Sequence, residues 1–404
     1  MEQVLYELPM GWEWHKLAEV VDLVTKGTTP TSVGFKFESS GINFVKIENI
    51  KSGKIDPTSF NSFISAEANK ALKRSMLYEG DILFSIAGTI GTVALVSSDV
   101  LPANTNQALA IIRGYEEYLI DRYLMHVLRS SISSTLNNKK RGGALQNISL
   151  KDIKETAIPI PSLAEQKRIV EKLDALLTRI DTAIKHLQES VTLADALYAS
   201  ELACVFSSGQ GKWPLRELNG VAEVARGKSK HRPRNDKSLF GGEHPFIQTG
   251  DVRNAQKYIT NYSATYNEKG LQQSKLWPKD TICLTIAANI GDVAILGMDA
   301  CFPDSVVGIS SSELETDYLY YFLTTLQQQL DSKANAAAQK NINLKILSEI
   351  KIPVPTLDEQ KSIVRQINEI DRLAVKAKAE MSEKITMMQQ LKASILDSAF
   401  KGEL

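Results

Sequence analysis

Several residue types are scarce in this chain, and their scarcity excludes whole classes of protein. Its 404 residues include three cysteines, Cys204, Cys283 and Cys301, at spacings that fit no Cys-x-x-Cys pair, and five scattered histidines. The sequence therefore predicts neither disulfides nor a structural zinc site. No window reaches eighteen uninterrupted apolar residues, and the first residues lack a basic segment followed by an apolar core. Neither a membrane span nor a secretion signal is expected, and the cytoplasm is the expected location.

The chain also has no net charge. Its 47 lysines and arginines balance 47 aspartates and glutamates. A protein that neutralises DNA phosphates needs clustered cations, so any basic surface must be local. Charged residues make up 23% and hydrophobic residues 43% of the chain, which is typical of globular protein. At this length, two cores are expected rather than one.

Familiar catalytic motifs are missing as well. The sequence has no H-E-x-x-H, no G-x-S-x-G and no dinucleotide-binding G-x-G-x-x-G. Gly227, Lys228 and Ser229 imitate the end of a phosphate-binding loop, but Ala222 stands where the first glycine is required. The absence of such motifs favours a binding protein over an enzyme.

What the chain does contain is a tandem repeat. The segment "IPIPSLAEQKRIV" at 158–170 recurs as "IPVPTLDEQKSIV" at 352–364, 194 positions later. Matching pairs lie upstream in the same order: "WEWHKL" with "WPLREL", "INFVKIENI" with "HPFIQTGDV", "GDILFSIAGTIGTVALV" with "KDTICLTIAANIGDVAIL", and "QNISL" with "KNINL". Their offsets lie between 194 and 202, so the differences are loop insertions. Duplication of a whole unit suits a binding protein with two similar halves.

Each copy is expected to be an α+β domain of about 150 residues followed by a long helix. Short β-branched runs punctuated by glycine predict strands at 82–86, 93–96, 282–286 and 293–296. Apolar residues at three-to-four spacing predict helices over 118–136 and 316–332. The expected boundaries are 1–157 for the first domain, 158–210 for a central helix, 211–351 for the second domain and 352–404 for a C-terminal helix.

The two long helices carry their own start signals and apolar stripes. Ser162 with Glu165 and Thr356 with Glu359 have the spacing of a capping box. In the first stripe the steps alternate between three and four residues, as in coiled coils. The second stripe is less regular and is interrupted by Lys384. The predicted seam consists of Val170, Leu173, Leu177, Ile180, Ile184, Leu187 and Val191 on the first helix and Ile363, Ile367, Ile370, Met381, Met388, Leu391 and Ile395 on the second.

Such stripes more often pack on their own domain, but the length of these helices favours pairing of the two helices with each other. About 40 residues make a helix roughly 60 Å long, which overruns a domain whose radius of gyration is near 15 Å. We therefore expect the helices to pair with each other as an antiparallel coiled coil, related by a pseudo-twofold axis. The N- and C-termini should then lie close together.

Local basic charge is the other notable feature. The segment "RGKSKHRPR" carries five cations in a loop marked by glycine and proline, and "NKKRGG" carries three. The counterpart of the first segment in the other copy is "TKGTTPTS", with Lys26 among hydroxyls. A single charge run is usually only a solvated loop. Several of them in a nearly neutral repeat protein favour contact with phosphates.

Over essentially its full length the chain resembles the specificity subunit of type I restriction-modification enzymes. The resemblance rests on the two "IP-x-P" segments, on "TKGTTPTS" followed by "GINFVKIENI", on "SIAGTIGTVALV", and on the terminus "SILDSAFKGEL" echoed by "SELACVFSSGQG". It implies two target recognition domains, similar in fold to those of adenine-N6 DNA methyltransferases, separated by antiparallel helices. Each domain would read one half of an asymmetric bipartite target in double-stranded DNA, and the helices would fix the gap between the halves.

The resemblance also implies partners and a division of labour. Two modification subunits would dock on the helix pair, and restriction subunits would join them. This chain would bind no metal or other cofactor and perform no catalysis, because S-adenosylmethionine, ATP and Mg²⁺ would be used by the partners. Two alternatives stay open at this point: a coiled-coil scaffold whose domains bind protein, and a self-sufficient methyltransferase or nuclease.

The two copies differ in the residues that would touch DNA, so contacts cannot be transferred between them. Lys and Arg would mainly hold phosphates, whereas Asn49 and Gln248 have the paired donor and acceptor that read adenine. The expected contact residues are Lys26, Thr28, Thr29, Lys46, Asn49, Lys139, Lys140 and Arg141 in the first domain, and Arg226, Lys228, Lys230, Arg232, Arg234, Gln248, Thr249 and Lys340 in the second.

Overall fold

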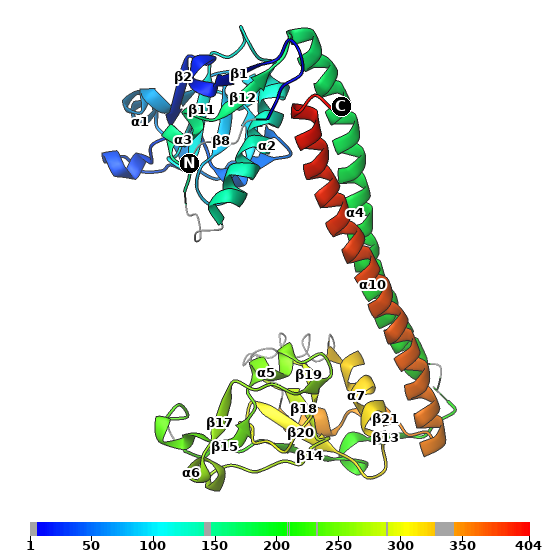
Figure 1. Ribbon diagram of the computed structural model, residues 1–404. Coiled ribbons are helices and arrows are strands. Elements are labelled where there is room, and N and C mark those ends of the chain that lie inside the picture. Colours follow the sequence, from blue (N-terminus) through cyan, green and yellow to red (C-terminus); the bar gives the residue numbers. More distant parts are fainter. Residues whose placement is uncertain are drawn as a thin grey trace. The chain divides into compact units, whose positions relative to one another are not determined.

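The computed structural model describes residues 6–140, 147–207, 209, 211–231, 233–287, 290–327 and 343–404, with backbone only for 131–140. The chain divides into two compact units, Met1–Leu187 with Glu383–Leu404 and Gln188–Ser382. Each unit contains one globular domain and part of both long helices (Figure 1). We call the part of the chain before the first long helix domain one, and the part between the two long helices domain two. No helix in the described ranges has the length and apolarity needed to span a bilayer.

Domain one is built on a six-stranded mixed sheet. Its strand order is β2-β11-β8-β9-β5-β4. The central strand β8 is buried on both faces, because Ile82 and Phe84 enter one apolar cluster and Leu83 enters another. The strands of this sheet are β2 (Leu23–Lys26), β4 (Ile50–Lys51), β5 (Lys54–Ile55), β8 (Ile82–Ser85), β9 (Val93–Leu95) and β11 (Leu109–Arg113).

Smaller elements complete domain one. A four-stranded sheet has the order β6-β3-β10-β7, and β1 pairs antiparallel with β12. The remaining strands are β1 (Glu13–Lys16), β3 (Ile42–Val45), β6 (Phe63–Ile64), β7 (Met76–Leu77), β10 (Ala103–Thr105) and β12 (Ala157–Ile160). The helices are α1 (Ala66–Ala71), α2 (Asp121–Lys140) and α3 (Leu150–Lys154).

Domain two repeats this arrangement. Its main sheet has the order β14-β20-β18-β19-β16, β15 pairs with β17, and β13 pairs with β21. The strands are β13 (Leu215–Glu217), β14 (Glu223–Arg226), β15 (Phe240–Phe246), β16 (Tyr258–Ile259), β17 (Ala264–Tyr266), β18 (Ile282–Thr285), β19 (Val293–Leu296), β20 (Val306–Ser310) and β21 (Lys351–Pro353). The helices are α5 (Thr249–Asn254), α6 (Glu268–Gln272), α7 (Thr316–Thr325) and α9 (Leu344–Ser348).

The tandem α+β repeat predicted from the sequence is therefore confirmed. The order β2-β11-β8-β9-β5 in domain one corresponds to β14-β20-β18-β19-β16 in domain two, with the same antiparallel and parallel pairings. In β18, as in β8, alternate side chains enter different cores: Ile282 and Leu284 one, Cys283 the other. All three cysteines are free.

The long helices are α4 (Leu163–Ser207) and α10 (Leu357–Phe400), of 45 and 44 residues. Both start where the sequence indicates. Thr356 and Glu359 form both bonds of a capping box, with the Thr356 N–H donating to the carboxylate at 2.8 Å. In α4 only half of the box forms, because the Glu165 carboxylate bonds to Arg168 instead.

The helices pair antiparallel within each unit. In unit one, Arg168 donates to the Leu404 carbonyl and Lys392 donates to Asp181 at 2.6 Å, so α10 runs backward as α4 runs forward. In unit two, Lys378 donates to Asp195 at 2.6 Å. The sequence prediction of an antiparallel helix pair is confirmed, and ion pairs flank the apolar stripe on both sides of the unit boundary.

The predicted seam is partly correct. Val170, Leu173, Leu177, Ile180, Ile363 and Ile367 are buried. The rest of the seam is half-buried, namely Ile184, Leu187, Val191, Ile370, Met381, Met388 and Ile395. The prediction that Leu391 belongs to the seam is wrong, because this residue is 46% exposed. The stripe on α10 passes through the half-buried Ile385, one residue beyond Lys384, and thereby avoids the interruption.

Part of each stripe packs on a domain rather than on the other helix. Val170, Leu173 and Leu177 belong to the main core of domain one, together with Phe400 from the end of α10. Likewise Ile363, Val364 and Ile367 join the core of domain two, with Leu202 and Phe206 from the end of α4. Packing on the domains thus explains the first part of each predicted stripe, and pairing of the helices explains the part that follows.

The first described residue, Tyr6, meets the end of α10 in unit one, as expected. The Tyr6 hydroxyl donates to the Phe400 carbonyl at 2.7 Å, and the Lys401 ammonium lies 5.7 Å from the centroid of the Tyr6 ring. The segment that precedes β1 therefore packs against the end of α10.

Candidate functional site

In domain one, the predicted contact residues gather at one edge of the domain. Lys26 is exposed at the end of β2, and Thr28 follows it. The Thr28 N–H donates to the Thr105 carbonyl at 3.1 Å, and the Thr105 hydroxyl donates to the Val45 carbonyl at 2.9 Å. Since Lys46 directly follows Val45, the two predicted segments meet around Thr105. The Thr29 hydroxyl donates to Gln107 at the same edge.

A glycine makes this close approach possible. A Cβ atom on Gly27 would lie 2.2 Å from the carbonyl oxygens of Thr105 and Asn106. The equivalent Gly227 in domain two would place its Cβ 2.2 Å from the Phe302 carbonyl. Both copies therefore require glycine directly after the exposed cation that ends the strand.

Domain two brings its predicted residues together in the same way. Arg226 is exposed at the end of β14, and the Gly227 N–H donates to the Val306 carbonyl at 2.9 Å. The Ile247 N–H donates to the Cys301 carbonyl at 2.8 Å, so Gln248 emerges beside the same 301–306 segment. Gln248 is exposed and precedes α5, whose first residue is the half-buried Thr249.

The basic loop of domain two is held by acidic neighbours. Arg234 donates to Asp304 at 2.6 Å, and His231 lies 2.7 Å from Asp236. Hydrogen bonds from the backbone and side chain of Ser238, with a further one from His231, lower the pKa of Asp236 to about 2. These pairs fix the loop while neutralising part of its charge.

The cations at the start of that loop are better placed for a ligand. Lys228 and Lys230 are exposed. Their backbones are anchored, because the Ser274 hydroxyl donates to the Lys228 carbonyl at 2.8 Å and the Lys230 N–H donates to the Gln273 carbonyl at 3.5 Å. With Arg226, they form an exposed cationic stretch on a fixed backbone.

Asn49 cannot read a base in this structure, which corrects the sequence prediction. It is 1% exposed, and its amide is fully occupied. The oxygen accepts from the Lys46 N–H at 2.8 Å, and the nitrogen donates to the Ser59 carbonyl at 2.9 Å and to the Ser59 hydroxyl at 3.1 Å. Asn49 shapes the turn after β3. Sequence reasoning missed this because a buried amide that satisfies a turn and an exposed one look alike in a sequence.

Lys46 is only partly available. Its side chain is 26% exposed, its ammonium donates to the Ser62 hydroxyl at 2.7 Å, and it lies 5.3 Å from the centroid of the Phe37 ring. Five other predicted positions cannot be placed. Arg141, Arg232 and Lys340 lie outside the described residues, and Lys139 and Lys140 are described only as backbone of α2.

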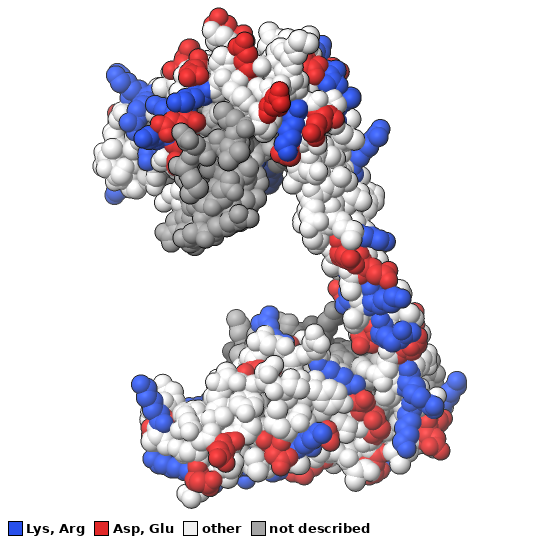
Figure 2. Space-filling view, in the orientation of Figure 1, with Lys and Arg blue, Asp and Glu red and all other residues white. Residues whose placement is uncertain are grey.

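One group of cations was not predicted. Lys70 in α1 and the following Lys73 and Arg74 are exposed. In the described parts of the chain none of the three forms an ion pair, whereas Lys51 and Lys151 do. Figure 2 shows Lys and Arg atoms gathered over the part of domain one that carries α1. The spacing "KALKR" is the signal that could have revealed this group, but one glutamate and several alanines dilute it.

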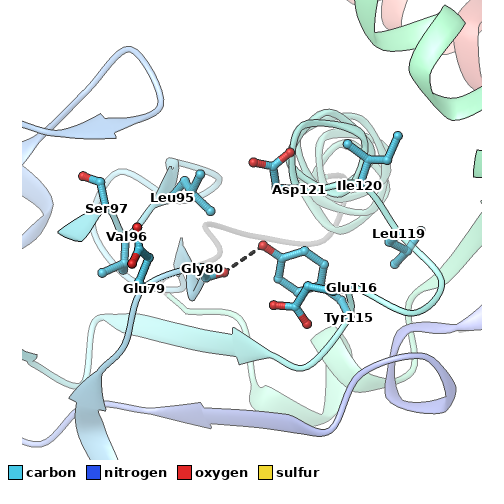
Figure 3. Close-up of a pocket in the computed structure, with 10 residues that line it drawn as sticks. All are labelled: Glu79, Gly80, Leu95, Val96, Ser97, Tyr115, Glu116, Leu119, Ile120 and Asp121. Atoms are coloured by element: carbon cyan, nitrogen blue, oxygen red, sulfur yellow. Dashed lines mark hydrogen bonds between the residues drawn. The ribbon is translucent and has the colours of Figure 1, made fainter.

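Two equivalent cavities are lined by none of the predicted contact residues. One of 420 Å³ in domain one lies between the turn at Glu79 and Gly80 and the connector that leads into α2 (Figure 3). The Tyr115 hydroxyl closes one side by donating to the Gly80 carbonyl at 2.7 Å. Glu79, Glu116 and Asp121 line it, and these carboxylates repel phosphate. A smaller cavity of 200 Å³, lined among others by Lys279, occupies the equivalent place in domain two.

The arrangement suits binding better than catalysis. Each domain presents exposed cations, hydroxyls or an amide at a sheet edge, and such groups contact phosphates and base edges. Within the described ranges, no group of three or more His, Cys, Asp or Glu side chains could hold a metal ion. The fold and this edge define a nucleic-acid-binding repeat protein whose two domains are each joined to a long paired helix.

Comparison with known proteins narrows this class. The family model described as type I restriction modification DNA specificity domain matches twice, over residues 9–193 and 210–387. A putative type I restriction enzyme MjaX specificity subunit of Methanocaldococcus jannaschii is 24% identical and is aligned over 98% of this chain and 95% of its own length. The EcoBI specificity subunit of Escherichia coli is 23% identical over 94% of this chain and 84% of its own length.

Solved structures similar to this chain come from the same kind of protein as these sequence relatives. A chain from a study of complex assembly and conformational transition of the type I R-M system has a TM-score of 0.78 and 26% identity, and the match covers 99% of this chain and 100% of that one. The HsdS subunit of Thermoanaerobacter tengcongensis, with a TM-score of 0.57 and 24% identity, shares the fold. The chain belongs to the type I restriction modification DNA specificity domain family. It is a specificity subunit with two DNA recognition domains, and the comparisons give no support to a protein-interaction scaffold.

Proposed function

We propose that each recognition domain reads one half of an asymmetric bipartite DNA sequence, and that the paired helices set the gap between the halves. The observation that carries this proposal is the recurrence of one fold with different side chains at the same edge. Lys26, Thr28 and Thr29 in domain one are replaced by Arg226, Lys228 and Ser229 in domain two. Two readers with the same scaffold and different contact residues fit two different half-sites.

Within each edge, the contacts divide by chemistry. The exposed cations Lys26, Arg226, Lys228 and Lys230 hold phosphates, which position the protein without reading sequence. Gln248 is exposed between β15 and α5, and its amide can give adenine one donor and one acceptor in the major groove. In domain one the reading group is not Asn49. The Thr28 and Thr29 hydroxyls are the candidates there.

The helices suit the role of spacer because they are long, continuous and paired. Half-sites that face one protein together lie about 34 Å apart, one turn of DNA. A stiff pair of helices restricts binding to one gap. Adding whole heptads to both helices keeps the apolar stripe in register and lengthens the pair by about 10 Å per heptad, so the recognised gap changes.

Exposed apolar pairs on the helices provide the docking surface for two modification subunits. Leu193 and Leu197 on α4 are 68% and 62% exposed, and Met387 and Leu391 on α10 are 55% and 46% exposed. The second pair follows the first by 194 positions, the offset of the repeat itself. Two equivalent apolar pairs fit two copies of one partner. The family to which the chain belongs supports the modification subunit as that partner.

The remaining assignments follow from this division of labour. The specificity subunit carries no catalytic group and binds no cofactor. Modification subunits use S-adenosylmethionine to methylate DNA, and restriction subunits use ATP and Mg²⁺. The complex works in the cytoplasm, where its DNA target is found.

Mapping methylated adenines in cells that express this chain with its modification subunits tests the proposal. The expected result is a split motif with two unlike halves and a constant gap, and the gap changes when both helices gain a heptad. A contiguous motif, or a gap that ignores helix length, would overturn it. Incubation of the purified chain alone with labelled S-adenosylmethionine and DNA is the control and should transfer no methyl group.

A further inference from the structure

A buried glutamine joins α4 to domain one. Gln166, in the first turn of α4, is 0% exposed. Its amide oxygen accepts from the Ile120 N–H at 2.9 Å, and its amide nitrogen donates to the carbonyls of Tyr118 and Pro161 at 2.9 and 3.0 Å. Residues 118–120 form the connector that leads into α2, so one side chain connects the helix start, the strand exit and the recognition domain.

The same device recurs in unit two. Gln360, in the first turn of α10, is 1% exposed. Its oxygen accepts from the Glu315 N–H at 2.7 Å, and its nitrogen donates to the carbonyls of Glu313 and Pro355 at 3.4 and 3.0 Å. Residues 313–315 precede α7, the counterpart of α2. Both glutamines stand at the same place in the repeated segments "AEQK" and "DEQK".

In each unit, a tyrosine of the domain also bonds to the strand that leads into the long helix. The Tyr123 hydroxyl in α2 donates to the Pro159 carbonyl at 2.8 Å, and the Tyr318 hydroxyl in α7 donates to the Pro353 carbonyl at 2.9 Å. Pro159 and Pro353 lie in the strands that lead into α4 and α10. In both units, therefore, the segment entering the long helix is bonded to the domain from two sides.

Apolar packing alone would not need these glutamines. Ile169 and Leu173 already attach α4 to the core of domain one, but apolar contacts have little directional preference. Hydrogen bonds from a buried amide form only in one geometry, and leaving them unmade is costly. The glutamines therefore select one angle between helix and domain among those that apolar packing allows.

We propose that Gln166 and Gln360 are positioning residues that set the angle at which each recognition domain leaves its helix, and thereby the gap between half-sites. This inference rests on the proposed spacer function of the helices. A domain of this size is about 30 Å across, so a tilt of about 10° displaces its far edge by about 5 Å. That displacement exceeds the roughly 3.4 Å rise of one base pair.

The test replaces each glutamine by leucine, which has a similar shape and lacks the amide. Gln166→Leu, Gln360→Leu and the double variant are assembled with modification subunits. Binding is measured to duplexes that carry both half-sites at the native gap, at one base pair more and at one base pair less. Each single variant should lose preference for the native gap by about tenfold or more, the effect of one mismatched base pair. Affinity for a duplex with a single half-site should not change.

Two controls separate positioning from folding. Val96→Ala removes methyl groups from a core of domain one that contains no residue of α4, so it lowers stability but should keep the gap preference. Gln188→Leu changes an exposed glutamine of α4 and should change neither the stability nor the gap preference. Gap preference retained in the double variant would overturn the proposal, and so would an equal loss in Val96→Ala at matched stability.

A second measurement does not depend on DNA. Spin labels on exposed Ser97 in domain one and Thr182 in α4 report the distance between domain and helix within unit one, with Cys204 replaced by serine. The distance distribution should broaden or shift in Gln166→Leu and stay unchanged in Val96→Ala and Gln188→Leu. If the unsubstituted complex shows no gap preference, the spacer function fails. The distance distribution then decides separately whether Gln166 sets the angle between domain and helix. An unchanged distribution in Gln166→Leu would overturn that positioning role as well.

Discussion

Alanine at Leu193 and Leu197 should remove one of the two proposed docking sites for modification subunits. The two side chains are 68% and 62% exposed. Full burial of a leucine contributes about 1.5–3 kcal/mol, so covering the exposed parts contributes about 1–2 kcal/mol each, or about 2–4 kcal/mol for the pair. The substitution should therefore weaken binding of one modification subunit by about 30-fold or more.

The repeat makes the second site its internal comparison. Met387 and Leu391 are less exposed, at 55% and 46%, so alanine at both should cost somewhat less, about 1.5–3 kcal/mol. Each double substitution should reduce the complex from two modification subunits to one at a concentration that still saturates the intact site. Native mass spectrometry gives the stoichiometry, and titration calorimetry gives the two affinities.

A matched control lies beside the patch. Gln389 and Gln390 are exposed on the same helix between the two apolar residues, and alanine at both should leave stoichiometry and affinity unchanged. Circular dichroism should confirm that all variants keep their helices. If both doubly substituted variants still bind two modification subunits at full affinity, the two apolar pairs are not the docking surfaces, and the reasoning is refuted.

Three further outcomes are expected. Replacing Arg226 and Lys228 by glutamine should weaken binding to all DNA sequences and lower the slope of log affinity against log salt by about 0.9 per lost phosphate contact; an unchanged slope would remove both residues from the interface. Burial is the main cause that lowers the pKa of His126, against an opposing hydrogen bond to Asp174. The unfolded chain therefore takes up the proton first, and the free energy of unfolding should fall as pH drops below about 6.5. His126→Tyr with Asp174→Asn copies the bond between Tyr321 of α7 and Asn368 of α10 in unit two and should flatten that pH dependence in urea unfolding, whereas an identical pH profile would contradict the assignment. A circular permutant joins the present termini and opens the chain in the connection between α4 and β13. It should fold and bind DNA with its partners, because the two ends are expected to lie close together. Failure of every such permutant to fold would count against this expectation.

Much of the architecture was predictable because repetition and periodicity are local properties of a sequence. The repeat defined two equivalent α+β domains, and the three-to-four spacing with capping residues located the start of both long helices. Helix length alone made pairing necessary, since about 60 Å of apolar stripe cannot be covered by one domain. The seam shows the limit of this reasoning, because it passes through Ile385, directly after Lys384, and leaves the predicted Leu391 exposed.

The site was less predictable because the role of a polar residue depends on what surrounds it. Lys26, Arg226 and Gln248 are exposed, and their contact with DNA stays a prediction. Asn49 satisfies the backbone of a turn, and Arg234 is paired with Asp304 from a distant strand connection. Neither partner is visible from the residue type or its sequence neighbours. Gln166 and Gln360 stand at the same place in the repeated segment of the sequence. Their hydrogen bonds to the connectors before α2 and α7, however, can be recognised only in the folded structure.

Apolar periodicity, capping residues and internal repetition depend on near neighbours along the chain, so they are enough to specify a duplicated α+β unit joined by paired helices. Which polar groups face solvent and which are buried depends on segments brought together from far apart, so it follows only from the folded structure. The same physical fact explains both Asn49 and the glutamines: a buried amide must find partners, and where those partners lie is a property of the fold.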